Sequence, residues 1–155
     1  MSLEELFRGR GLDLPASMMR LKNVAAELGL PWGMRLRTYN SRRAQELGKW
    51  AEVLGKGDEF HQAVFQAYFA AGRNIADISV LKEIAGTIGL DGRLAEQAVA
   101  ERSFKEAVDR DWEYSRTCGI TAVPTFMVDG RKVVGAQPYQ ALADLVRAAG
   151  GNMRQ

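Results

Sequence analysis

Sulfur and imidazole groups are scarce in this chain, which contains one cysteine, Cys118, and one histidine, His61, among 155 residues. One cysteine cannot supply a dithiol, so no disulfide framework can form within these residues. One histidine without clustered partners does not provide the ligand set that zinc needs, and we predict neither a metal nor a cofactor. The glycine motifs that bind phosphates in P-loop and dinucleotide-binding domains are missing as well.

Long apolar runs and strong net charge are also absent. No stretch approaches the roughly 20 apolar residues of a membrane-spanning helix. Residues 1–10 are charged and lack the apolar centre of a secretory signal. The net charge of +2 is too small to indicate nucleic acid or a membrane surface as partner. With a lone cysteine, which suits a reducing compartment, these features predict a cytoplasmic protein that binds neither.

Helical periodicity is the main pattern over residues 1–117. Capping residues mark the predicted helix starts and glycines mark their ends. The starts are Ser2, Asp13, Asn40 or Ser41, Asp58, Asp77, Asp91 and Ser103. The second helix carries an apolar stripe at helical spacing, formed by Leu14, Met18, Leu21, Val24, Ala25 and Leu28. We predict that such stripes face a core.

The period changes after Gly119, which ends the last of these helices. Residues 125–128 and 131–134 alternate as short strands, and the Asp129-Gly130 pair between them is typical of a tight hairpin turn. Pro124 stands at the mouth of the first strand, where a missing N–H costs no ladder bond. A last helix begins at Gln137-Pro138, and residues 152–155 are expected to fray.

The hairpin region resembles a known family. Residues 121–130 read Thr-Ala-Val-Pro-Thr-Phe-Met-Val-Asp-Gly, and residues 133–139 read Val-Val-Gly-Ala-Gln-Pro-Tyr. Together they resemble the cis-proline half of DsbA-like thioredoxin-fold oxidoreductases. Residues 37–48 and 67–75 are similar to the helical insertion of the FrnE-type branch of that family.

Members of this family also carry an N-terminal strand, a Cys-X-X-Cys motif (a serine in kappa-class transferase relatives) and a second strand, none of which matches these residues. The resemblance therefore implies a mostly helical α+β protein. It would be an incomplete thioredoxin-like fold, a C-terminal β-hairpin plus helix, with a large α-helical insertion domain. The expected parts are an insertion-type subdomain over residues 1–117, a β-β-α part over residues 118–151 and the tail.

The resemblance implies a thiol-disulfide oxidoreductase lineage in which Ala122, Val123 and Pro124 line the substrate site. The substrate would be a disulfide-containing protein or a small thiol. Without a dithiol the chain by itself is expected to be inactive, as a truncated or split form, and no residue is assigned a catalytic role. The competing interpretation of residues 122–124 is a structural turn kept without chemistry.

Two alternatives belong to other classes. The first is a non-catalytic interaction module, a homodimer through the unpaired edge of the strand Thr125–Val128, because an exposed apolar edge invites another chain. The second is a relative of glutathione-linked isomerases and transferases. Their usual aromatic Gly-Gln-Asp pattern is replaced here by residues 134–138, Val-Gly-Ala-Gln-Pro, which favours the FrnE-type branch.

Three further features can be interpreted either as functional sites or as ordinary structural residues. Cys118 ends a helix, where partial negative charge disfavours a thiolate, so a buried, inert small residue is favoured over intermolecular pairing or reactivity. His61 is interpreted as a partly exposed helix residue. A basic group near Trp32 and Tyr39 could hold a phosphate or an acidic thiol, or be a solvated helix face that Glu27, Glu46 and Glu52 offset. This group consists of Arg35, Arg37, Arg42 and Arg43.

Overall fold

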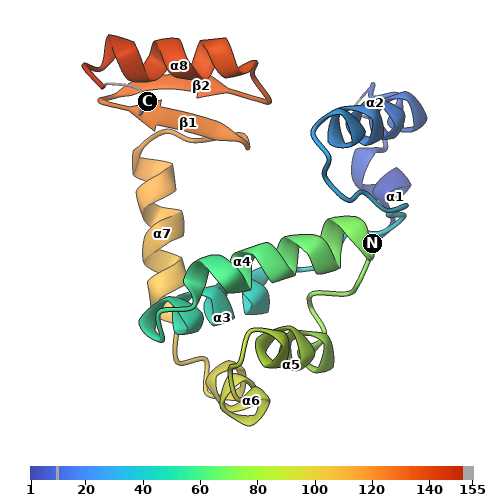
Figure 1. The fold of residues 1–155 in the computed structure, drawn as a ribbon, viewed down its shortest axis with the longest axis vertical. Helices are drawn as coiled ribbons and strands as arrows, with labels where there is room; N and C mark the ends of the chain where they lie inside the picture. The colour runs from blue at the N-terminus through green and yellow to red at the C-terminus, as the bar shows by residue number, and fades with distance from the viewer. Residues whose placement is uncertain (10, 152–155) are drawn as a thin grey trace. The chain divides into compact units, whose positions relative to one another are not determined.

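The computed structural model of this protein describes residues 1–9 and 11–151 (Figure 1). The chain divides into two compact units, Met1–Asp109 and Arg110–Gln155. The assignment of residues 1–117 to an insertion-type subdomain and of 118–151 to a β-β-α part stays a prediction. The tail predicted to fray, residues 152–155, lies outside the described residues.

The described fold is mostly helical, with one two-stranded sheet near its C-terminal end. The first unit contains α1 (Leu3–Phe7), α2 (Leu14–Glu27), α3 (Arg42–Val53), α4 (Gly57–Phe65), the π-helical turn η1 (Gln66–Ala70), α5 (Ile78–Thr87) and α6 (Gly92–Ala100). Helix α7 (Lys105–Thr117) runs into the second unit, which continues with β1 (Thr125–Val128), β2 (Arg131–Val134) and α8 (Tyr139–Ala148). No helix in the described part of the chain is both long and apolar enough to cross a bilayer.

Side-chain caps begin several helices where the sequence predicts them. Ser2 and Glu5 form the reciprocal capping box of α1, with Ser2 Oγ accepting from the Glu5 N–H at 3.0 Å. The carboxylates of Asp13, Asp77 and Asp91 accept from the first turns of α2, α5 and α6. These contacts satisfy backbone donors that a helix start otherwise leaves unpaired. The prediction for α4 is wrong by two residues, since its N-cap is Lys56 and Asp58 lies inside the first turn.

The core of the first unit lies between α3, α4 with η1, α5 and α6. Phe60, Leu47 and Leu81 are fully enclosed, and smaller apolar residues fill the spaces between these helices. Helical spacing places Leu54, Phe65 and Leu94 on apolar helix faces, but they lie outside this core and are 48%, 58% and 54% exposed. Leu54 follows the last residue of α3, where the helix no longer holds it against α4.

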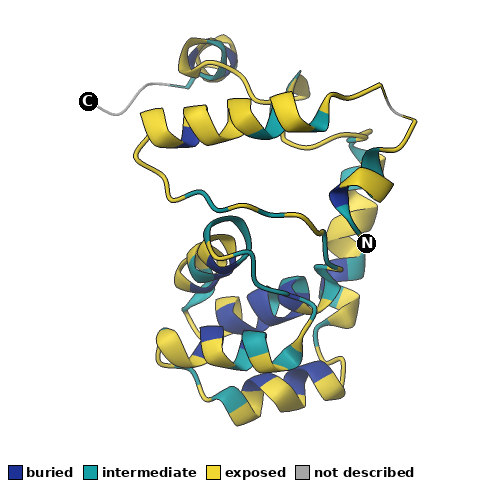
Figure 2. Ribbon diagram, turned by 90° about the vertical axis from the view of Figure 1, so that its right-hand side faces the viewer, coloured by how far each residue is buried: buried dark blue, intermediate teal, exposed yellow. Residues whose placement is uncertain are grey.

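The apolar stripe of α2 is only partly buried, contrary to the prediction of a core-facing stripe. Ala25 is buried, whereas Leu21, Val24 and Leu28 are 46%, 44% and 67% exposed. Most of the α2 ribbon accordingly has the colour of exposed residues in Figure 2. Periodicity identifies the apolar face of a helix but not the partner that covers it. Among the described residues, α2 is contacted by α1 and lies beside the segment after Pro31.

The second unit contains the predicted hairpin. β1 and β2 pair antiparallel, with Thr125 opposite Val134 and Val128 opposite Arg131. Asp129 and Gly130 both adopt positive φ, 49° and 74°, which is the geometry of a two-residue type I′ turn. Helix α8 packs against this hairpin, and its Ala143 and Leu145 are buried. The packing gives a two-stranded sheet the support that it lacks alone in water.

Candidate functional site

The loop between α7 and β1 begins at a well-defined helix end. The Ile120 N–H donates to the Ser115 carbonyl at 3.0 Å, and the Gly119 N–H donates to the Arg116 carbonyl at 2.8 Å. This pair of bonds is the Schellman arrangement, and Gly119 takes the left-handed conformation that it requires, with φ of 64°. Cys118 is thereby fixed as the helix cap, and the loop that follows starts from a fixed point.

The predicted substrate-site residues Ala122, Val123 and Pro124 are all exposed on this loop, and Val123 is 89% exposed. The Val123–Pro124 peptide bond is cis. The neighbouring carbonyls are used internally: Ala122 accepts from Thr125 Oγ1 at 2.6 Å, and Pro124 accepts from the Gly135 N–H at 2.8 Å. Within the described residues, no hydrogen bond reaches the N–H or the carbonyl of Val123. At Val123 the loop thus offers a main-chain donor and a main-chain acceptor to another molecule.

The same edge continues along β1. In an antiparallel ladder the N–H groups of a strand point alternately toward and away from the partner strand. The bond from Gly135 to Pro124 places residue 124 on the paired side, as it does Phe126 and Val128. The N–H groups of Thr125 and Met127 therefore point outward, and β1 pairs with no strand other than β2 among the residues described.

Cys118 is half-buried, so the prediction of a buried residue is wrong, because the residue caps the end of α7 and is only partly covered. The Lys132 ammonium donates to the Cys118 carbonyl. A hydrogen bond to the Cys118 thiol raises the pKa of the Tyr114 hydroxyl, which is thereby favoured in its neutral form. A lysine and a neutral tyrosine at a helix end give no geometry for a nucleophile with its own base, which agrees with the interpretation of Cys118 as inert.

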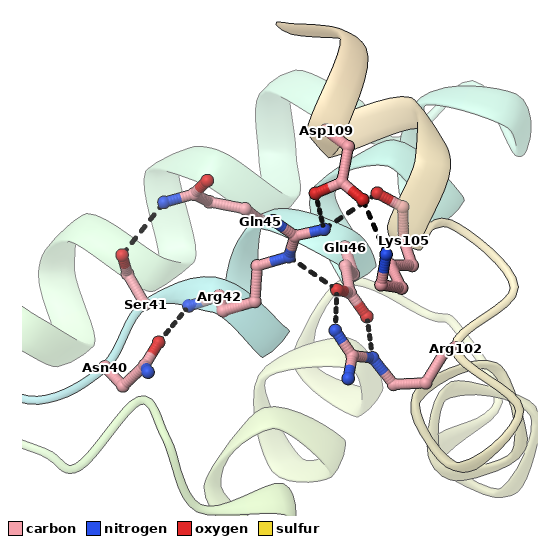
Figure 3. A network of polar contacts seen from close by, with 8 residues as sticks. All are labelled: Asn40, Ser41, Arg42, Gln45, Glu46, Arg102, Lys105 and Asp109. Atoms are coloured by element: carbon pink, nitrogen blue, oxygen red, sulfur yellow. Dashed lines mark hydrogen bonds and ion pairs between the residues drawn. The ribbon is translucent and has the colours of Figure 1, made fainter. Parts of the chain in front are cut away.

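The predicted basic group is not one surface, because the structure separates its arginines. Arg42 lies at the start of α3 and is only 15% exposed, with Nε 2.7 Å from Glu46 Oε1 and Nη2 2.6 Å from Asp109 Oδ1. Arg102 approaches the same Glu46 carboxylate through Nε at 2.9 Å and Nη2 at 2.7 Å (Figure 3). The Arg102 bonds, followed by those of Arg42, hold the Glu46 pKa below its usual value against the effect of burial.

Glu46 is therefore a buried structural carboxylate, 2% exposed, and not part of a solvated face. The sequence reasoning missed it because it counted Glu46 only as a charge offsetting the arginines. Arg42 is correspondingly unavailable to an anionic ligand. A signal was present, since Arg42 and Glu46 stand four residues apart on the helix, but that spacing is equally common on exposed helix faces.

Arg35 belongs to a different cluster. Its guanidinium lies over the Tyr68 ring, 4.5 Å from the centroid, and it donates to the Tyr68 hydroxyl. Thr38 Oγ1 is 3.2 Å from the same hydroxyl, and Phe69 stacks on Trp32 at 5.8 Å between centroids. Tyr68 and Phe69, with Trp32 stacked on Phe69, thus form an aromatic surface on which the Arg35 guanidinium rests, called the aromatic shelf below.

His61 is an exposed residue of α4, in line with the interpretation from sequence. Its ring lies against Gly48 of α3, where an added Cβ would come within 2.6 Å of Nε2. No group of three or more His, Cys, Asp or Glu side chains that could hold a metal ion occurs among the described residues.

A family model and a solved structure match nearly the whole chain, and a curated relative matches about half of it. A family model described as DSBA-like thioredoxin domain matches residues 12–147. YwbO, an uncharacterised protein of Bacillus subtilis, is 34% identical over 88 residues, 56% of this chain and 44% of that protein. The crystal structure of a probable DsbA oxidoreductase from Streptomyces coelicolor superposes with a TM-score of 0.82 and 25% identity, over 99% of this chain and 69% of that chain. The chain spans less than half the length of the curated relative it matches.

Proposed function

The chain belongs to the family of DSBA-like thioredoxin domains, and we propose that it acts in thiol–disulfide exchange as a FrnE-type member whose reactive sulfurs lie outside these 155 residues. Its loop 121–124 would hold an extended substrate beside those sulfurs. The substrate is a disulfide-containing protein or a small thiol, and residues 122–124 are the contact.

Thiol–disulfide exchange needs two cysteine sulfurs, and this requirement shows why sulfurs from outside these residues are part of the proposal. A thiolate attacks one sulfur of the substrate disulfide, the S–S bond breaks, and the other sulfur leaves as a thiolate while a mixed disulfide forms. A second cysteine then attacks the mixed disulfide and releases the reduced substrate. The chain has one cysteine, Cys118, so it cannot supply both sulfurs. It can supply the surface against which the substrate lies.

The unpaired main chain of Val123 is the observation that supports this role. An extended peptide that pairs with an exposed edge gains main-chain hydrogen bonds without any demand on its sequence. Val123 provides an N–H and a carbonyl without partners in the described chain, and β1 continues the same edge directly after it. A site of this kind suits a protein that handles many different unfolded substrates.

Peptide binding tests the proposal directly. The ¹⁵N-labelled chain is titrated with reduced, S-alkylated insulin B chain, an unfolded polypeptide that cannot exchange disulfides. We expect amide shifts concentrated at residues 121–127. Val123→Glu should weaken them, because a hydrated carboxylate beside the main-chain donor and acceptor opposes the close approach of the peptide, and a residue that is 89% exposed can be changed without disturbing the fold. Val53→Glu, at a 73% exposed valine of α3, is the matched control and should bind normally.

An insulin-reduction assay tests the second half of the proposal. With dithiothreitol as reductant, the chain alone should not accelerate insulin precipitation beyond a Cys118→Ser variant. Turnover that depends on Cys118 would contradict the idea that the sulfurs come from elsewhere. Shifts that leave residues 121–127 untouched, or that are equally large in Val123→Glu, would contradict the peptide site.

A second candidate function is a non-catalytic module that dimerises through β1. The outward N–H groups of Thr125 and Met127 favour it, because they are free to pair with a second copy of the strand. Met127→Pro removes one outward donor and no donor of the hairpin ladder. Val134→Pro makes the same change on the outer edge of β2 and is the control. Analytical ultracentrifugation should show a dimer that only Met127→Pro abolishes, and a monomer at all concentrations would eliminate this candidate.

A further inference from the structure

A pocket of about 750 Å³ lies in the first unit, beside α2. Its volume is in the range of pockets that take small organic ligands. The lining consists of residues from α1, α2 and the irregular segment after Pro31. These are Ser2, Leu3, Glu4, Leu14, Pro15, Met18, Met19, Lys22, Trp32, Gly33, Met34, Arg35, Leu36 and Arg37.

The walls are mainly apolar and adaptable. Three methionines, Met18, Met19 and Met34, line the pocket. Met19, Met34 and Leu36 are 56%, 83% and 72% exposed. Methionine side chains are flexible and polarisable, and they fit apolar ligands of different shapes. Large apolar side chains gathered around a concavity, rather than scattered singly, indicate a binding surface.

The charge of the pocket is one-sided. Lys22, Arg35 and Arg37 line it against a single carboxylate, Glu4, and none of the three cations forms an ion pair with another described residue. The charge of Arg37 makes the smallest of the contributions that lower the pKa of Glu5, in the first turn of α1. By contrast, Arg42 and Arg102, which lie outside the pocket, share the Glu46 carboxylate.

Arg35 is the fixed cation of the three. Its guanidinium is held on the Tyr68 and Phe69 rings, 4.5 and 5.5 Å from their centroids. Its Nε is buried without a hydrogen-bond partner in the described part of the chain. A half-buried charge whose donors are incompletely satisfied gains strongly from an anion nearby, because water screens the pair poorly there.

We propose that this pocket binds an amphiphilic carboxylate, an acyl chain with an acidic head group. The chain would lie along Met18, Met19 and Leu14, and the carboxylate would sit among Arg35, Lys22 and Arg37. The concave shape and the volume favour a small molecule over a flat protein surface, and the unpaired cations favour an acid over a neutral lipid. The residues of this site belong to the first unit, whereas the proposed peptide edge of residues 121–127 belongs to the second.

Calorimetric titration with decanoate, below the concentration at which it forms micelles, tests the proposal on the whole chain. Decanol has the same apolar chain without the charge. We expect decanoate to bind about tenfold tighter than decanol or better, since a charge-assisted pair with a guanidinium is among the stronger polar contacts. Amide shifts of the labelled protein should map to α2 and to residues 32–37.

Matched variants on α2 locate the site. Lys22→Gln should weaken decanoate about two- to fivefold, whereas Arg20→Gln, a cation of the same helix that does not line the pocket, should have no effect. Met19→Glu should abolish binding, and Leu28→Glu, at a 67% exposed leucine outside the lining, should not. Arg35→Met should cost about tenfold or more, with the unfolding temperature measured to show that the shelf persists.

Three results would overturn the proposal. Equal affinity for decanoate and decanol would show that the cations play no part. No decanoate binding up to about 1 mM would leave the pocket without an acyl ligand of useful affinity. Light scattering that shows a dimer with the α2 amides protected, and no decanoate binding, would mean that a second copy covers the face.

Discussion

Replacing Glu46 by alanine removes the centre of the network that joins the start of α3 to residues 102–109. The carboxylate is 2% exposed and accepts from Arg42 Nε at 2.7 Å and from Arg102 Nε and Nη2 at 2.9 and 2.7 Å. Truncation leaves two guanidinium groups facing a position from which their counter-charge has gone.

The magnitude follows from what each arginine can do afterwards. Removing one partner of a buried ion pair costs about 3–5 kcal/mol in general. Arg102 is 46% exposed and can turn to water, and Arg42 keeps Asp109 at 2.6 Å. Because hydration of Arg102 and the Arg42–Asp109 pair compensate in part, we expect a loss of unfolding free energy at the lower end of that range, about 3 kcal/mol. Glu46→Gln keeps the shape and one acceptor, and should cost about 1–2 kcal/mol.

Urea unfolding followed by tryptophan fluorescence measures this loss. A Trp112→Phe background leaves Trp32 and Trp50, both in the first unit, so that the signal reports on that unit alone. The midpoint should fall while the denaturant slope stays the same. Glu52→Ala is the matched control, because Glu52 also lies on α3 and pairs with Lys49 at 3.1 Å, but is 44% exposed. It should cost only about 0.2–0.5 kcal/mol.

The outcome that would refute the reasoning is a Glu46→Ala variant within about 1 kcal/mol of Glu52→Ala, the size of a surface ion pair. Burial of the carboxylate and its two guanidinium contacts would then contribute nothing beyond what an exposed glutamate does. A changed slope would instead mean that the variant alters the denatured or native ensemble, and the midpoint could not be interpreted alone.

The remaining predictions use the same unfolding assay. Arg102 has a φ of 56°, a left-handed conformation that favours glycine, so Arg102→Gly should be more stable than Arg102→Ala by about 1 kcal/mol, and the reverse order would contradict the strain. Because the folded-state Glu46 pKa lies below 4.5, its stabilisation is full above pH 4.5 and is lost as pH falls further; Glu46→Gln should flatten that acid limb. Leu28→Ser, at a 67% exposed residue, should change stability by no more than about 0.5 kcal/mol, whereas Leu47→Ala, fully buried, should cost about 2–5 kcal/mol; equal effects would show that α2 is covered in solution.

Local chemistry explains which parts of the fold could be predicted from the sequence. The capping box at Ser2 and the caps at Asp13, Asp77 and Asp91 depend on residues within three positions of each other. The hairpin follows from the Asp129-Gly130 pair, which tolerates positive φ at both positions. Each of these signals is complete within a few residues, so no tertiary information is needed to interpret it.

Features that depend on distant partners could not be predicted in the same way. Glu46 is buried because Arg102, 56 positions away, reaches its carboxylate, and nothing local distinguishes it from Glu52. The stripe of α2 has core spacing, but the described residues cover it only in part. The loop 121–124 was found through the resemblance and its proline. The unpaired backbone of Val123 appears only once the hairpin bonds are known.

The π-helical turn η1 makes the aromatic shelf under Arg35 sensitive to chain length. In this turn the Ala71 N–H donates to the Gln66 carbonyl at 3.0 Å, five residues back, so the segment holds one residue more than an α-helix would. Because successive helix residues are about 100° apart, deleting that residue would rotate Phe69 away from Trp32. An alignment of homologues can therefore be sorted by length at this position: only those that retain the insertion would inherit the ring pair on which the guanidinium rests.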